Sequence, residues 1–105
     1  MGTLHYGGNR FPIDDRLLAH LQVVLTMKLR RKEGFFITWT VEASRGGGQD
    51  SIWVDNGVPI RCHYQGSGRP LINREWAEKL TLAANTSAGL VIGPGSIEPS
   101  EGSPA

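Results

Sequence analysis

The sequence predicts an α+β fold, a single small domain in which two helices pack on one face of a mostly antiparallel sheet. Two observations support this prediction. Two segments carry apolar residues at helical spacing, and the shorter segments around them alternate apolar and polar residues, as strands do. The expected order is β-β-α-β-β-β-α-β. Because the chain has 105 residues, we expect one domain, at residues 1–92.

The first helix is predicted from about Asp15 to Lys32. Asp14 and Asp15 suit its start, because carboxylates cap the first turn and favour the positive end of the helix dipole. Gly34 is expected to stop the helix. The residues that fall on one broad face, which we assign to the core, are Leu17, Leu18, Leu21, Val24, Leu25 and Leu29.

The strands are predicted from alternation and from turn residues. Two short strands, at residues 3–6 and 10–13, flank a Gly-Gly-Asn turn. In a longer strand at 35–42, alternate side chains point to opposite faces, and Trp39 is on the face that points to the core. Asp55-Asn56-Gly57 predicts a type I′ hairpin turn between a strand at 51–54 and a return strand at 58–65. Residues 90–92 are expected to form a last strand.

The second helix is predicted from Arg74 to about Ala84, capped by Asn73, with Trp76 and Leu80 on its inner face. From residue 93 the chain reads GPGSIEPSEGSPA. Such a composition buries too little apolar surface to offset the entropy of ordering, so we expect a disordered tail at 93–105.

Composition narrows the function classes. The net charge of +1 means that any contact with nucleic acid must rest on a local basic patch. Cys62 is the only cysteine, which excludes an internal disulfide and a cysteine-built zinc site and favours a cytoplasmic location. We expect no membrane contact, because no apolar run is long enough for a membrane helix.

Much of the chain is similar to a family of short actinobacterial proteins. The similarity includes the Met-Gly-x-Leu-x-Tyr start and the segments DDRLLAHLQVVLTMKLRRKEGFFITW, SIWV and INREWAEKLTLAANTSAGLVI. It spans nearly the whole chain up to Ile92. The sequence differs from the family pattern at Lys32-Glu33-Gly34 and at VDNG, two predicted turns. The family has no established biochemical function, although its members often carry the label "ATP-dependent DNA ligase".

Ligase chemistry itself is not expected. An ATP-dependent ligase uses the lysine of a Lys-x-Asp-Gly motif, and none of the lysines at 28, 32 and 79 is followed by that pattern. The resemblance therefore implies an accessory role near DNA metabolism. No nucleophile set or acid/base pair stands at a meaningful spacing, and no two histidines have the spacing of helical metal ligands. We expect a non-enzymatic binding module without a cofactor or a metal.

The preferred partner is DNA or RNA, or a DNA-processing protein. Flexible cations contact phosphates, and exposed aromatic rings stack on unpaired bases. Trp53 is the best aromatic candidate, because it alternates out of phase with Ile52 and Val54 and is therefore expected to be exposed. The alternative is that the basic run only complements the negative end of the first helix. The candidate contacts are Lys28, Arg30, Arg31, Lys32, Trp53, Arg61 and His63.

A second hypothesis is a protein-interaction or homodimerisation module with no role in nucleic-acid binding. Val23 and Met27 lie away from the core face of the first helix, beside Arg16 and His20. An apolar strip flanked by cations is typical of an interface. The alternative is that the first strands and the sheet cover this strip. The interface candidates are Arg16, His20, Val23 and Met27.

Overall fold

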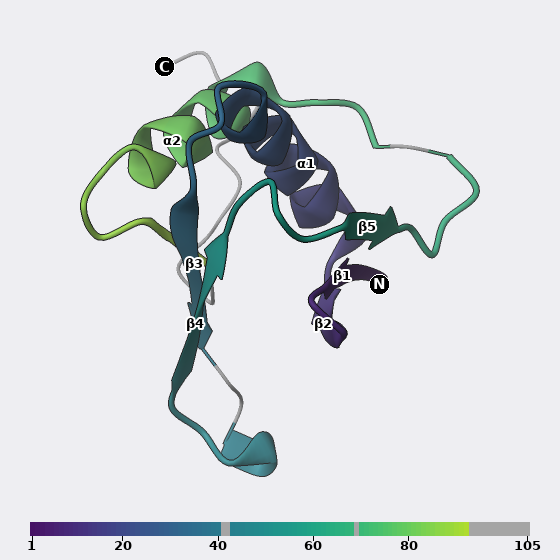
Figure 1. The fold of residues 1–105 in the computed structure, drawn as a ribbon. Coiled ribbons are helices and arrows are strands. Elements are labelled where there is room, and N and C mark those ends of the chain that lie inside the picture. Colours follow the sequence, from purple (N-terminus) through teal and green to yellow (C-terminus); the bar gives the residue numbers. More distant parts are fainter. Residues whose placement is uncertain (41–42, 69, 93–105) are drawn as a thin grey trace.

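A computed structural model describes residues 1–40, 43–68 and 70–92 (Figure 1). The predicted tail at 93–105 and the last residues of the strand predicted at 35–42 lie outside this range. The α+β class and the predicted order of elements are confirmed. The elements are β1 (Gly2–Tyr6), β2 (Asn9–Ile13), α1 (Asp15–Arg30), β3 (Phe35–Thr40), the short 3₁₀ helix η1 (Ala43–Arg45), β4 (Gln49–Val54), β5 (Ile60–His63), α2 (Arg74–Ala84) and β6 (Leu90–Ile92).

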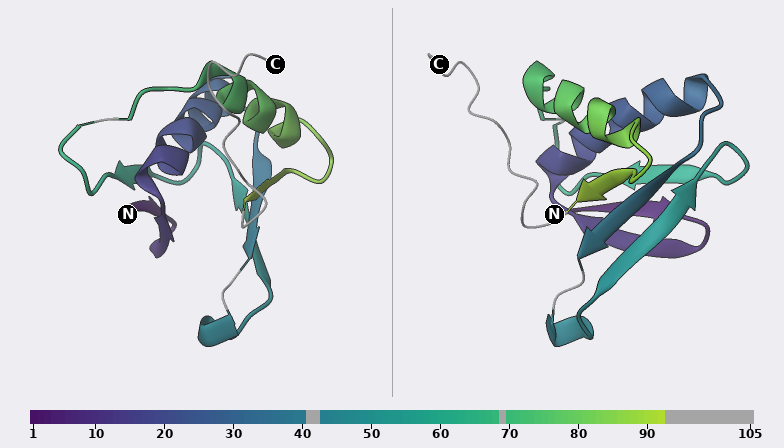
Figure 2. Two further views of the ribbon diagram at one scale, coloured as in Figure 1. Left: turned by 180° about the vertical axis from the view of Figure 1, so that it is seen from behind. Right: turned by 90° about the vertical axis from the view of Figure 1, so that its left-hand side faces the viewer.

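The strands are divided between two sheets, a separation that the sequence did not indicate. One sheet has the order β2-β1-β5 and is antiparallel throughout. The other has the order β4-β3-β6, in which β4 is antiparallel to β3 and β6 is parallel to it. Both helices lie on the same side of this pair of sheets (Figures 1 and 2).

The predicted hairpin at Asp55-Asn56-Gly57 is wrong. The strands on either side of this turn belong to different sheets, since β4 pairs with β3 and β5 pairs with β1. Neither Asn56 nor Gly57 has the positive φ that a type I′ turn requires. The turn is instead held by its own side chains, because the Gly57 N–H donates to the Asp55 carboxylate at 2.8 Å and Asn56 Nδ2 donates to the carbonyl of Leu29 at 2.8 Å.

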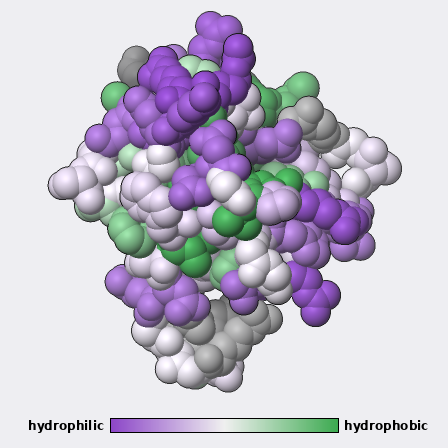
Figure 3. Space-filling view, viewed as in Figure 1, coloured by the Kyte–Doolittle hydropathy of each residue, from purple (hydrophilic) through white to green (hydrophobic). Residues whose placement is uncertain are grey.

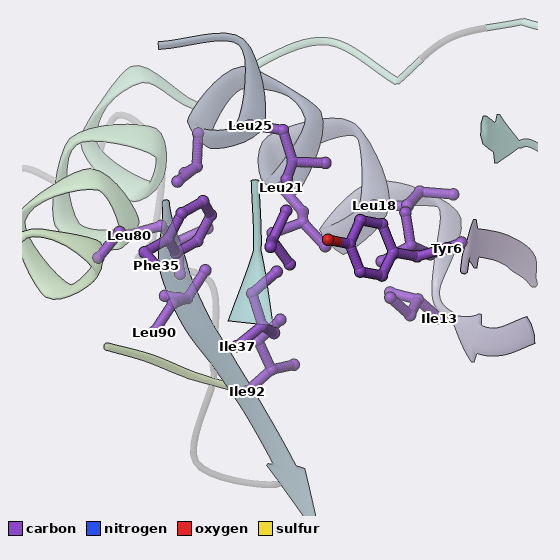
Figure 4. Packing of buried hydrophobic residues seen from close by; sticks show 14 of the residues in the cluster. Tyr6, Ile13, Leu18, Leu21, Leu25, Phe35, Ile37, Leu80, Leu90 and Ile92 are labelled. Carbon is purple, nitrogen blue, oxygen red and sulfur yellow. The ribbon is translucent and has the colours of Figure 1, made fainter. Parts of the chain in front are cut away.

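The hydrophobic core lies between the two sheets and beneath α1 (Figure 4). Tyr6 of β1 faces Ile37 of β3, and Leu18 and Leu21 of α1 close the space between them. The Tyr6 hydroxyl donates to the carbonyl of Trp53 at 3.0 Å and accepts the N–H of Asp55 at 3.2 Å. This hydroxyl therefore ties the first sheet to the end of β4.

Helix α1 begins as predicted and ends earlier than predicted. The Asp14 side chain accepts the N–H groups of Arg16 and Leu17, which caps the first turn. At the other end the helix stops at Arg30, and Lys32 adopts the left-handed conformation with φ of 58°. The N–H groups of Lys32 and Glu33 satisfy the last carbonyls of the helix. Gly34 is therefore not the residue that ends it.

The two helices are joined by a buried histidine. His20 of α1 is fully buried, and its Nε2 accepts the N–H of Asn73 at 2.7 Å. Because the backbone N–H must be the donor in this bond, Nδ1 carries the ring proton, which it donates to the carbonyl of Arg16 at 2.7 Å. Asn73 in turn caps α2. The ring of Trp76 packs against His20 with centroids 4.5 Å apart.

Candidate nucleic-acid interface

The outer face of the β4-β3-β6 sheet carries exposed aromatic side chains. Phe36 and Trp53 are directly opposite each other on β3 and β4, and they are 45% and 50% exposed. Their rings meet edge to face, with centroids 5.2 Å apart. Val91 of β6 is also exposed on this side of the sheet, opposite Thr38. We call Phe36, Trp53 and Val91 the aromatic face; the exposure predicted for Trp53 is confirmed.

Trp53 is fixed in place by its neighbours. Its indole Nε1 donates to the Asp55 carboxylate at 3.0 Å. Its ring also lies directly over Gly34, where an added Cβ would come within 2.5 Å of ring carbon Cζ2. Only glycine therefore fits at position 34, and its role is to seat the indole on the turn that leaves α1. A ring held on two sides offers contact area with little entropy left to lose.

The basic run from Lys28 to Lys32 is divided by the structure. Lys28 is buried, and its ammonium donates to Asn85 Oδ1 at 2.8 Å and pairs with Glu33 at 3.3 Å. The Lys28 ammonium therefore already has its partners inside the fold, and Lys28 does not belong to the candidate contact surface. Arg30, Arg31 and Lys32 are exposed. In the chain they immediately precede Glu33 and Gly34, and Gly34 is the residue on which the Trp53 ring rests. Figure 3 shows hydrophilic residues gathered at the top of the view, where α1 turns into β3.

Arg61 and His63 do not join this surface. Both are exposed on β5, in the other sheet. Residues of both sheets meet in one core, so the outer faces of the two sheets point away from each other. Arg61 and His63 instead lie in the same sheet as His5 and Arg10, which are not among the contacts predicted from the sequence. The pairing of β1 with β2 across the Gly7-Gly8 turn was the signal that could have found them, since it places Arg10 opposite His5.

The residues predicted for an interface fall into two groups. His20 is buried between the helices and Arg16 Nη1 donates to the carbonyl of Leu71 at 3.0 Å, so these two belong to the joint between α1 and the segment before α2. Val23 and Met27 line an open groove of about 830 Å³ between the helices. Exposed apolar residues from the α2 side, Ile72 and Leu82, complete this groove, and the sequence analysis did not include them.

Within the described residues, no three histidine, cysteine or acidic side chains are grouped closely enough to hold a metal ion. In the same part of the chain, no helix is both long and apolar enough to cross a membrane.

Residues 1–95 match a family described as a domain of unknown function, DUF7882. The chain belongs to this family. No curated protein and no solved structure matches the chain. The DUF7882 match covers every described helix and strand, so both sheets and both helices are part of the family's domain.

Proposed function

We propose that this DUF7882 domain is a non-enzymatic module that binds single-stranded nucleic acid on its aromatic face. The observation that carries the proposal is the exposed Phe36–Trp53 pair. Three exposed cations at the end of α1 precede, in the chain, the glycine on which Trp53 rests. Proteins that bind single strands combine these two elements, because aromatic rings stack on bases and flexible cations follow the phosphates.

The arrangement favours single strands over duplexes for a geometric reason. Bases in a duplex are already stacked on each other, so their faces are closed to a protein ring. The aromatic face also lies on a sheet rather than on a protruding helix, and the helix is the element that most often enters the major groove. Arg30, Arg31 and Lys32 would contact the backbone while bases lie against Phe36 and Trp53.

The resemblance to proteins labelled as ligases supports a role for this proposed activity near DNA processing. The module would act in the cytoplasm. It would be an accessory to an enzyme and not the ligase itself, since the chain lacks the ligase lysine motif. A single-strand binder suits such a role, because nicks and gaps expose short unpaired segments.

The proposal is tested by titrating labelled single- and double-stranded DNA and RNA at two salt concentrations. We expect Trp53 fluorescence to be quenched by single strands, because this indole is exposed whereas Trp76 is buried. Phe36→Ala and Trp53→Ala should each weaken binding by about tenfold, since stacking contributes roughly 1–3 kcal/mol per base. Arg30→Gln/Arg31→Gln should reduce the slope of log K against log salt by about 1.4, at about 0.7 per phosphate contact.

The matched control is Arg74→Gln/Lys79→Gln, which removes the same charge from exposed positions on α2. If this control weakens binding as much as Arg30→Gln/Arg31→Gln, the attraction is only general charge. If no single strand binds at low salt, or if Phe36→Ala and Trp53→Ala bind like the unmodified protein, the proposed function is wrong.

The groove between the helices supports a second candidate, homodimerisation. Met27, Ile72 and Leu82 are exposed along it, and Arg74 and Glu78 also line it, so a second copy would meet both apolar and oppositely charged groups. Light scattering over a range of protein concentrations tests this. We expect a dimer that Leu82→Glu converts to a monomer, whereas a monomer at every concentration would exclude it.

A further inference from the structure

The outer face of the β2-β1-β5 sheet gathers basic side chains from all three of its strands. The strand register places Arg10 of β2 and Arg61 of β5 on either side of His5 of β1. In the next outward-facing row, His63 lies opposite Thr3. Arg10, Arg61 and His63 are exposed and His5 is half-buried between them. We call His5, Arg10, Arg61 and His63 the cationic face.

The described part of the protein does not neutralise the arginine charges on this face. Among the described residues, neither Arg10 nor Arg61 has an ion-pair partner. Partial burial of the ring, together with the charges of Arg61, Arg10 and His63, lowers the pKa of His5. The Asp15 carboxylate interacts electrostatically with His63, and its oxygens accept the N–H groups of Gln65 and Gly66 at 3.1 and 2.9 Å.

Like charges placed side by side cost free energy in the absence of a ligand. Cations on adjacent strands repel each other, and a chain with a net charge of +1 has no general excess of positive charge to make such a cluster expected. An anion bound across the row would remove that repulsion. Arginine presents planar pairs of N–H donors that match phosphate oxygens, so two arginines flanking a histidine suit linked phosphate groups.

The shape of the face limits what it can recognise. Three neighbouring strands span about 10 Å, at about 4.8 Å between strands. This width is suited to two or three linked phosphate groups. The side chains stand on an open sheet, and none of them lines the groove between the helices. The face can therefore contact oxyanions but cannot enclose a base or a sugar.

We propose that the cationic face is a second binding site, separate from the aromatic face, for a ligand that carries adjacent phosphate groups. The ligand is either a free oligophosphate or a stretch of nucleic-acid backbone, and the shared chemistry is two or three linked phosphates. The site does not depend on the proposed function, because it lies on the opposite sheet and shares no residue with the aromatic face.

The site should bind more tightly as the pH falls. In the free protein the flanking arginines disfavour the charged form of His5, while a bound anion favours it, so binding raises the pKa of His5 and takes up protons. Tightening is expected as the pH falls through the histidine range, around 6.5.

The experiment is a titration of the protein with inorganic tripolyphosphate. Binding is measured by calorimetry and by the NMR signals of the histidine rings. We expect the His5 signal to shift on binding and its pKa to rise. Arg10→Gln/Arg61→Gln should weaken binding by about tenfold, since two charge-assisted contacts are lost. The control Lys79→Gln, at an exposed position on α2, should bind as the unmodified protein does.

A second ligand isolates the histidine effect. The terminal phosphate of tripolyphosphate also titrates near neutral pH, so the pH series uses sucrose octasulfate, whose sulfate esters stay ionised. Binding should tighten between pH 7.5 and pH 5.5, and His5→Gln should reduce this dependence. A pH-independent affinity, with no movement of the His5 signal, would overturn the proposal.

Oligonucleotides distinguish the two sources of phosphate. If tripolyphosphate binds and Arg10→Gln/Arg61→Gln leaves single-strand binding unchanged, the ligand is a free oligophosphate. If the same variant weakens oligonucleotide binding while Phe36→Ala and Trp53→Ala do not, the cationic face holds the nucleic-acid backbone and the function proposed for the aromatic face fails. If the variant changes the binding of neither tripolyphosphate nor the oligonucleotide, the cationic face is not a binding site. That result leaves the function proposed for the aromatic face unaffected.

Discussion

The two ends of α1 use their polar side chains differently. At the start of the helix, Asp14, Asp15 and His20 all bond to backbone groups of the domain. At the other end, only Lys28 points inward, and Arg30 and Arg31 remain exposed, without an ion-pair partner among the described residues. The first end holds the fold together, whereas the second leaves charge available to a ligand.

This difference shows why a run of like residues cannot be interpreted as one unit. Four of the five residues from Lys28 to Lys32 are basic, yet helical geometry turns successive residues by about 100°. Lys28 faces Phe35, whose ring centroid is 5.8 Å from its ammonium, whereas the other three cations of the run are exposed. Substitutions at the two ends should accordingly separate stability from binding.

The largest effect is expected at the first end, from His20→Phe. Phenylalanine keeps a ring against Trp76 but leaves the buried N–H of Asn73 and the carbonyl of Arg16 without their present partner. An unsatisfied buried group costs about 1–3 kcal/mol, so we expect a loss of about 2–3 kcal/mol in the free energy of unfolding.

Chemical denaturation measures this loss, and hydrogen exchange at Asn73 should accelerate with it. Thr26→Ala is the control on the same helix, because its hydroxyl is exposed and bonds only to the carbonyl of Gln22. Equal stability of His20→Phe and the unmodified protein would mean that the helices are not joined through this ring.

At the second end, Lys28→Met should cost about 1–2 kcal/mol. The methionine keeps an apolar stem but removes the contacts to Asn85 and Glu33, of which the Glu33 contact is half-exposed and therefore weak. A double-mutant cycle with Asn85→Ala should show coupling between the two positions.

Lys28→Met should also leave the salt dependence of oligonucleotide binding unchanged, whereas Arg30→Gln/Arg31→Gln should reduce it. A reduced slope in Lys28→Met would return Lys28 to the contact surface and remove the distinction between inward and outward cations.

The sequence predicted the helices well because each has a cap and an apolar stripe at fixed spacing. Asp14 and Asn73 cap them as predicted, and Leu18, Leu21 and Leu80 are buried as predicted. These signals are local, so a single sequence contains them in full. The early end of α1 was missed because the left-handed position is filled by Lys32 rather than by glycine.

The division into two sheets could not be predicted in the same way. The Asn-Gly pair at 56–57 favours a hairpin locally, but the long-range pairing of Ile60 with Tyr6 and of Val54 with Phe35 overrides it. The candidate surfaces depend on these pairings. Trp53 was found because its exposure follows from alternation within one strand, whereas the His5–Arg61 neighbourhood depends on a register between strands far apart in the chain.

Lys32→Gly should act in the opposite direction, by stabilising the second end. The left-handed conformation strains a residue that has a Cβ, and glycine adopts it without that cost. Glycine also gains freedom in the unfolded chain, so the net gain should be about 0.5–1 kcal/mol. Thermal unfolding measures it; a loss of stability, as for glycine inside a helix, would show that Lys32 is not left-handed in solution.

The smallest effect, and one confined to acid, is expected from Asp15→Asn at the first end. Hydrogen bonds from the N–H groups of Gly66 and Gln65 lower the pKa of Asp15 below its usual value of 3.8. A lowered pKa means that the carboxylate stabilises the fold above the unfolded pKa and loses this effect as the pH falls through the folded pKa.

Asp15→Asn should therefore be less stable than the unmodified protein at neutral pH, and the difference should shrink below about pH 4. Denaturation curves at pH 7 and pH 3 test this, with Asp50→Asn, an exposed β4 residue, as the control. A constant difference at both pH values would show that Asp15 acts through shape rather than charge. The first end of α1 would then owe its rigidity to Asp14 and His20 alone.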